Sequence, residues 1–134
     1  MRTTFSNPDG VGAPVGNYSH VARVEAGDAA FLFISGQVAI DSDGTLVGEG
    51  DMARQCEQTF ENLRLILEDQ GATFADVVKL NTYTTDMSQL GVLREVRGRY
   101  ISTEPPASTT VEVSGLFRPE VLVEMEVVAV VPSG

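Results

Sequence analysis

The stretch Val121-Leu122-Val123-Glu124-Met125-Glu126-Val127-Val128-Ala129-Val130 decides the fold, because it predicts a β-strand with one wholly apolar face. β-Branched residues dominate the stretch, and its polar side chains recur at every second position. Glu124 and Glu126 fall on the opposite face. Burying an unpaired carboxylate costs on the order of several kcal/mol. That second face is therefore either in contact with water or part of a polar pocket built on the sheet.

The preceding stretch, Pro105-Pro106-Ala107-Ser108-Thr109-Thr110-Val111-Glu112-Val113, predicts another strand by the same alternation. Ser108 and Thr110 fall on one face of it, whereas Thr109 and Val111 fall on the other. The two prolines prevent a helix from continuing into the strand.

The length of 134 residues predicts a single domain over residues 1–134. Hydrophobic residues make up 43% of the chain and charged residues 21%, proportions that are typical of a globular domain and not of a disordered segment. The formal net charge is −10. Such a surface repels phosphate backbones, so we expect no nucleic-acid partner.

The numbers of cysteine and histidine residues and the lengths of the apolar runs argue against a disulfide-bonded, a metal-binding and a membrane-spanning protein. Cys56 is the only cysteine, which excludes an intrachain disulfide and favours a reducing compartment. His20 is the only histidine, and no metal-ligand spacing accompanies it, so no metal site is expected. No apolar run approaches membrane-spanning length, and we expect a cytoplasmic protein without a membrane partner.

Three further strands are predicted before the C-terminal pair. They cover residues 18–25, 30–40 and 77–85. Ser35-Gly36-Gln37 interrupts the second of them, where a glycine permits a bulge or a close backbone approach.

Two helices are predicted. Asp51 is expected to cap a helix that runs to about Gln70 and stops at Gly71, with Cys56 on its apolar stripe. A second helix is expected over residues 86–100. This order predicts an α+β layer with two helices on one face of a sheet. Because the strands are apolar on both faces, we expect self-association to bury the uncovered face.

The ordered motifs resemble the reactive intermediate deaminase family, RidA, which is also called YjgF. The resemblance spans Gly16 to Val130. Its matching segments are Gly16-Asn17-Tyr18-Ser19, Phe33-Ile34-Ser35-Gly36-Gln37-Val38, Gln55, Asn62-Leu63, Gly71-Ala72, Asp76-Val77-Val78-Lys79, Thr85-Asp86-Met87, Pro105-Pro106-Ala107, Thr110-Val111-Glu112-Val113 and Val123-Glu124-Met125-Glu126-Val127-Val128-Ala129-Val130.

This resemblance implies a chorismate-mutase-like α+β fold, a mixed sheet with two helices on one face, assembled as a homotrimer with clefts between subunits. In active members these clefts hydrolyse enamines and imines derived from amino acids, and no cofactor is needed. The resemblance implies that Glu124 places and activates the attacking water, as the catalytic residue. It also implies that Tyr18 and the backbone of Ser35 and Gly36 line the pocket. Ser108 and Thr110 are expected to contact the substrate from the C-terminal strand.

The chain departs from the family pattern where the substrate carboxylate would bind. The family has an arginine after Pro-Ala, and this chain has Ser108, which offers one neutral hydroxyl in place of a charged fork. Arg94 stands where the family commonly has an asparagine, so it is a candidate for a relocated anion site. The alternative is a solvated helix face of Arg94, Arg97 and Arg99. The C-terminal strands are expected to form a hairpin that carries Ser108 and Glu124 on the same side.

Three functions remain open from the sequence. The first is an enzyme that hydrolyses a reactive imine, enamine or related metabolite, with ordinary 2-imino acid deamination in doubt because of Ser108. The second is a non-catalytic trimer that binds a small metabolite or acts in regulation. The third is an endoribonuclease, which the net charge of −10 and the lack of a histidine pair for acid–base catalysis argue against.

Overall fold

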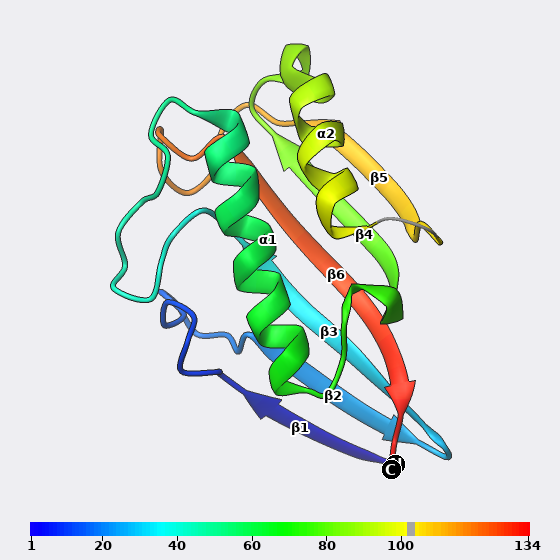
Figure 1. Cartoon of the computed structure of the whole chain (residues 1–134). Helices are drawn as coiled ribbons and strands as arrows, with labels where there is room; N and C mark the ends of the chain where they lie inside the picture. The colour runs from blue at the N-terminus through cyan, green and yellow to red at the C-terminus, as the bar shows by residue number, and fades with distance from the viewer. Residues whose placement is uncertain (102–103) are drawn as a thin grey trace.

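A six-stranded mixed sheet carries both α-helices on one face in the computed structural model, which describes residues 1–101 and 104–134 (Figure 1). The strands lie in the order β1-β2-β3-β6-β4-β5, and only β4 and β5 pair in parallel. The elements are β1 Arg2–Ser6, β2 Val21–Ala26, β3 Ala29–Gln37, α1 Met52–Asp69, the 3₁₀ helix η1 Phe74–Asp76, β4 Val77–Thr84, the 3₁₀ helix η2 Met87–Gln89, α2 Leu90–Tyr100, β5 Ala107–Glu112 and β6 Val123–Pro132. The predicted α+β layer with two helices on one face is confirmed.

The central strand β6 has the two faces that its alternation predicts. Val123, Met125 and Val127 are buried beneath the helices, whereas Glu124 and Glu126 point to the other side and are half-buried. The strand pairs with β3 on one side and β4 on the other. Its apolar face therefore forms the middle of the core.

The expected C-terminal hairpin is wrong, because β4 lies between β5 and β6. Leu80 of β4 pairs with Ser108, and Tyr83 pairs with Glu124. Leu80 is fully buried under the helices, whereas Tyr83 is on the uncovered side. Within one chain, Ser108 and Glu124 consequently lie on opposite faces of the sheet. A period of two residues assigns the faces of a strand but does not say which strand it pairs with.

Helix α1 begins and ends where the sequence predicts. The Asp51 side chain accepts a hydrogen bond from the Arg54 N–H at 3.1 Å, and Gly71 adopts the positive φ of 73° that follows a helix end. Cys56 and Phe60 are fully buried against the sheet, and Phe60 stacks on Tyr100 of α2 with 4.7 Å between ring centroids. Burial, and secondarily the charge of nearby Glu57, raises the pKa of the Cys56 thiol to about 12.

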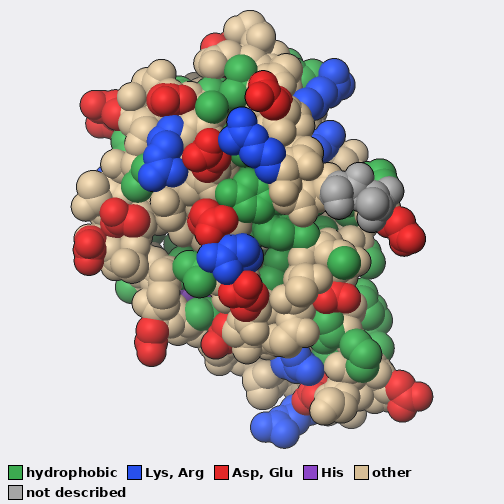
Figure 2. All heavy atoms as spheres, viewed as in Figure 1, with side chains coloured by type: hydrophobic (Ala, Val, Ile, Leu, Met, Phe, Trp, Pro, Cys, Tyr) green, Lys and Arg blue, Asp and Glu red, His purple; other side chains and the backbone are tan. Residues whose placement is uncertain are grey.

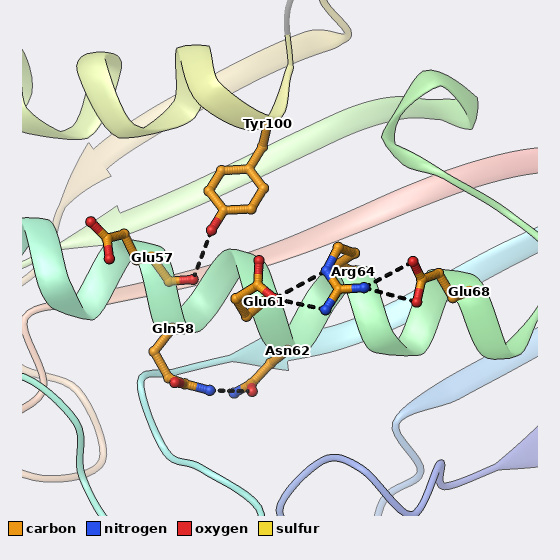
Figure 3. Close-up of polar contacts among 7 residues, drawn as sticks. All are labelled: Glu57, Gln58, Glu61, Asn62, Arg64, Glu68 and Tyr100. Carbon is orange, nitrogen blue, oxygen red and sulfur yellow. Dashed lines mark hydrogen bonds and ion pairs between the residues drawn. The ribbon is translucent and has the colours of Figure 1, made fainter.

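The outer surface of the helices is densely charged. Acidic and basic side chains are interspersed there (Figure 2). Arg64 lies between Glu61 and Glu68 with 2.8 Å ion pairs to each (Figure 3). Such exposed pairs each contribute about 0.2–1 kcal/mol, so the fold depends mainly on the core.

The other face of the sheet is uncovered in the single chain and is strongly apolar. Phe33 is 48% exposed, and its neighbours in register are Ala22 of β2 and Val128 of β6. Phe31 and Phe5, on the same face, are also exposed. This surface agrees with the expectation that a second face needs covering, and the homotrimer itself stays a prediction.

Candidate functional site

The sequence-predicted site residues fall into two separate places. Tyr18, Ser35, Gly36 and Glu124 line a cavity of about 500 Å³, here called the Glu124 recess. Its further lining includes His20, Gln37, Phe117, Arg118 and Glu126. Arg94, Ser108 and Thr110 line a different cavity of about 370 Å³ between α2 and β5, here called the α2–β5 cleft. One chain therefore does not bring the seven residues together.

An irregularity in β3 builds the wall of the Glu124 recess. Between Ile34 and Gln37 the strand carries one more residue than β6, so that the Ser35-Gly36 pair lies opposite Glu126 alone. This bulge agrees with the predicted interruption at Ser35-Gly36-Gln37. The Ser35 hydroxyl donates to the carbonyl of Ser19 at 2.6 Å, which holds the bulge beside the segment that carries Tyr18.

Gly36 lets the Glu124 carboxylate lie directly against the backbone. A Cβ built at Gly36 would overlap with the Oε2 atom of Glu124 and would lie 2.9 Å from its Cδ atom. Burial, and then the charge of Glu126, raises the pKa of Glu124 above its ordinary value. The Glu124 carboxylate accepts no hydrogen bond and forms no ion pair within residues 1–101 and 104–134. It is therefore a carboxylate with a raised proton affinity whose oxygens remain available to a ligand.

Glu126 differs from Glu124, although it lies only two residues away. Its Oε1 atom accepts hydrogen bonds from the Tyr83 hydroxyl at 2.8 Å and from the Asn81 amide at 3.2 Å. The bond to Glu126 is the main reason why the pKa of Tyr83 is raised. Glu126 is thus held by β4, and the two carboxylates have separate environments on the same strand.

His20 is a residue of the recess whose place the sequence did not predict. The residue is 2% exposed. The strand predicted over 18–25 begins only at Val21, so His20 lies just before β2 and not within it. Its Nε2–H donates to the Gly12 carbonyl at 2.8 Å, and its Nδ1 has no partner in the described part of the chain. Burial lowers the pKa of His20, so it is neutral at pH 7. No cluster of metal-ligating side chains occurs among the described residues.

Two buried amides of α1 fix the segments around the recess. Asn62 donates to the carbonyl of Ile40 at 2.9 Å, which holds the chain that follows β3. Gln55 donates to the carbonyl of Glu120 and accepts from the N–H of Leu122, both at 2.9 Å. Gln58 in turn bonds to Asn62 (Figure 3). The resemblance named both amides without a role, and the structure shows that they position loops.

In the α2–β5 cleft, Ser108 contacts Arg97, whereas the candidate for a relocated anion site was Arg94. The Arg97 Nη1–H donates to the Ser108 hydroxyl at 3.1 Å, whereas Arg94 is exposed and lines the same cleft. Arg99 pairs with Glu57 at 2.9 Å and with Glu95 at 3.5 Å. The alternative of a solvated helix face therefore agrees with the exposure of Arg94 and Arg99, whereas Arg97 points to β5.

Replacing Gly36 by alanine is expected to lower any activity that depends on Glu124 by about tenfold or more, because the added methyl forces the carboxylate to move. The melting temperature should change little, since the atom in the way is the end of a flexible side chain and the φ of Gly36 is not positive. Gly115→Ala is the matched control, because a Cβ there meets open space. Full activity in Gly36→Ala would contradict the assigned role of this contact.

Comparison with known proteins places the chain among relatives of similar length. The family model described as Endoribonuclease L-PSP matches residues 11–131. A RutC family protein of Pyrococcus abyssi is 37% identical over 116 residues, which are 87% of both chains. The crystal structure of RidA from an Antarctic Psychrobacter is 34% identical, with a TM-score of 0.84 over 96% of this chain and 99% of that one. A structure titled a putative endoribonuclease, from Thermotoga maritima, is 37% identical, with a TM-score of 0.85 over 97% of this chain and 98% of that one.

Neither of the two α-helices in the described residues combines the length and apolarity that crossing a bilayer requires.

Proposed function

Because this chain belongs to the Endoribonuclease L-PSP family, which includes the RidA and RutC proteins, we propose that it hydrolyses a small reactive imine or enamine in clefts between identical subunits. At the level of the family, membership supports a small-molecule deaminase- or hydrolase-like role. The particular substrate and the catalytic step are the proposal.

The observation that carries the proposal is the environment of Glu124. A carboxylate with a raised pKa is a better general base near neutral pH than an ordinary one. Its oxygens are free of partners in the described residues and face a recess that Tyr18 and the Ser35-Gly36 backbone also line. Such a group can take a proton from a water molecule held beside it.

The proposed reaction needs no other reagent than water. Glu124 removes a proton as the water oxygen bonds to the imine carbon, and the π electrons of C=N move to nitrogen. The protonated Glu124 then returns a proton to that nitrogen. Glu124 next takes the proton of the new hydroxyl group and passes it to the amino nitrogen. The C–N bond then breaks as the oxygen forms C=O, its electron pair leaves with the nitrogen, and the products are ammonia and a carbonyl compound. An enamine enters the same sequence after a proton moves from its nitrogen to its β-carbon, which converts it to the imine.

Two observations support the proposed homotrimer: the separation of the two cavities within one chain, and the uncovered apolar face. Phe31, Phe33 and Val128 lie on the uncovered side, and β5 is an edge strand that pairs only with β4. In the proposed assembly, packing of this face places the α2–β5 cleft of one subunit beside the Glu124 recess of the next. The site would then take Ser108, Thr110 and Arg94 from one subunit and Tyr18, Ser35, Gly36 and Glu124 from another. We infer a cytoplasmic location for this assembly.

A second candidate is a trimer that binds a small metabolite without converting it. It is favoured by Ser108, which has only a neutral hydroxyl where the family pattern has a guanidinium. Ribonuclease activity is not proposed. The chain has a net charge of −10, and its only histidine is bound to the Gly12 carbonyl.

The deciding experiment is an ammonia-release assay on 2-aminoacrylate generated in situ and on a neutral imine of similar size. We expect release to exceed the buffer rate with at least one of the two compounds, because a positioned general base contributes about 10²–10⁴-fold. Absence of acceleration with both compounds, in a protein whose assembly is confirmed by light scattering, would reject the hydrolase and leave the binding protein.

A further inference from the structure

The α2–β5 cleft contains two arginines that have no acidic partner. Arg97 reaches Ser108 from α2, and Arg94 lies three residues earlier on the same helix and lines the same cleft. Arg23, Arg54, Arg64 and Arg99 each form an ion pair, whereas Arg94 and Arg97 form none within the described ranges 1–101 and 104–134. In a chain with a net charge of −10, two unpaired guanidinium groups on one wall make a local positive site.

The rest of the cleft lacks negative charge. Its other lining residues are Thr82, Met87, Leu90, Leu93, Ser108, Thr110 and Met125, and none is acidic. The acid that follows on the same face of β5 is Glu112, whose Oε1 accepts the Met87 N–H at 2.8 Å and so is occupied at η2. An anion entering the cleft would therefore meet donors without a competing carboxylate.

The hydrogen-bond donors of the cleft and its apolar side chains together favour one chemical class of ligand. Guanidinium groups bind planar oxyanions through paired N–H bonds, and the hydroxyls of Ser108 and Thr110 add single donors. Leu90, Leu93 and Met125 supply an apolar floor, which suits a hydrocarbon chain better than a fully solvated inorganic ion. A cavity of about 370 Å³ has room for a compound of a few carbon atoms.

We propose that Arg97, with Arg94 beside it and Ser108 as its support, forms a binding site for a small organic carboxylate. The anion clamp is thus supplied by α2, and β5 contributes a hydroxyl that orients it through the 3.1 Å bond from Arg97. That this carboxylate belongs to the imine substrate rests on the function proposed above. The binding of a carboxylate at this site does not depend on that proposed function.

The test is a titration of the full-length protein with pyruvate, a stable 2-keto acid of the size that imine hydrolysis would release, followed by NMR or calorimetry. Arg97→Ala is expected to weaken pyruvate binding by about tenfold to a hundredfold, since hydrogen bonds to a charged group are among the stronger ones. Arg97→Lys keeps the positive charge but loses the planar guanidinium that binds a carboxylate through two N–H groups. Its affinity for pyruvate should therefore lie between those of the unmodified chain and Arg97→Ala. Arg99→Ala is the matched control on the same helix and should leave binding unchanged, because Arg99 is engaged by Glu57 and Glu95.

A rescue variant keeps the proposal falsifiable even if Arg97→Ala perturbs α2. Arg97→Ala combined with Ser108→Arg returns a guanidinium to the same cleft from β5 and should recover most of the affinity. Unchanged pyruvate binding in both Arg97→Ala and Arg97→Lys would overturn the proposal, and so would equal losses in Arg99→Ala. Inorganic phosphate that binds at lower concentration than pyruvate would overturn the carboxylate class.

The outcome separates this inference from the proposed function. In a Glu124→Gln background, which should lose turnover, Arg97→Ala should still weaken pyruvate binding, because Arg97 and Glu124 lie on opposite faces of the sheet within one chain. Pyruvate binding that depends on Arg97 in a protein without hydrolytic activity would support the clamp and reject the hydrolase. If Arg97→Ala leaves the rate of hydrolysis unchanged, the carboxylate site at Arg97 does not bind the substrate, and the proposed hydrolase activity is retained.

Discussion

Glu124→Gln is expected to lower the rate of imine hydrolysis by about 10²–10⁴-fold, the contribution of a positioned general base, while the folded protein becomes more stable. The amide cannot accept the proton of the attacking water. The substitution also removes the partly desolvated negative charge of Glu124, which lies near Glu126. This charge opposes folding at neutral pH. Activity and thermal unfolding should be measured on the same preparation.

The pH dependence of this effect has a definite sign. The pKa of Glu124 is raised in the folded state, so the folded chain holds the proton more tightly than the unfolded chain. Protonation of Glu124 therefore stabilises the folded chain. This contribution is fully present below the pKa that Glu124 has in the unfolded chain, and it is lost as the pH rises through the pKa that Glu124 has in the folded chain. The advantage of Glu124→Gln in melting temperature should therefore be largest near neutral pH and vanish in acid. Activity of the unmodified chain should fall as pH drops through this raised pKa.

Glu126→Gln is the matched control for Glu124→Gln. It removes the same charge from the same strand, but Glu126 is bound to Tyr83 and Asn81 and is not assigned the proton transfer. We expect it to retain activity within about tenfold of the unmodified chain. If Glu124→Gln keeps full activity, or if the two variants lose it equally, Glu124 is not the general base.

Phe33→Glu is expected to convert the predicted homotrimer into single chains. Phe33 is 48% exposed at the middle of the uncovered apolar face, between Ala22 and Val128 in register. A carboxylate at each copy of this position would have to be desolvated when that face packs, which costs on the order of several kcal/mol per subunit. Light scattering after size-exclusion chromatography measures the mass of the assembly.

Ser42→Glu is the control for Phe33→Glu, since it adds the same charge in the exposed Asp41–Gly44 turn. The mass of the assembly should stay unchanged in this control. Phe33→Glu should also lose hydrolysis, because the site is proposed to join two subunits. A folded Phe33→Glu variant that remains trimeric would show that another surface holds the subunits together.

Local chemistry predicted the helices and strand faces, because their signals lie within a few residues. The Asp51 cap, the Gly71 stop and the buried Cys56 of α1 are all confirmed. The alternation in β6 correctly separated Glu124 from its apolar neighbours. Each of these features depends on the period of the element and on the preferences of single residues.

Long-range pairing was not predictable in the same way. Nothing in the alternation of 105–113 indicates that β4 comes between β5 and β6, because that depends on where the connection through α2 places the chain. The arginine that contacts Ser108 was not predictable for a related reason. Helical spacing puts both on one side of α2, and only the rotation of the helix against β5 decides which one reaches Ser108.

The position of Cys56 has a consequence for a protein proposed to handle electrophiles. Imines and enamines that escape into solution alkylate or condense with nucleophiles, and among side chains the thiolate is one of the most reactive. The chain has one sulfhydryl, which is fully buried in α1, and its pKa of about 12 leaves almost no thiolate at neutral pH. The fold thereby shields its single soft nucleophile from self-alkylation by the compounds that its clefts are proposed to consume.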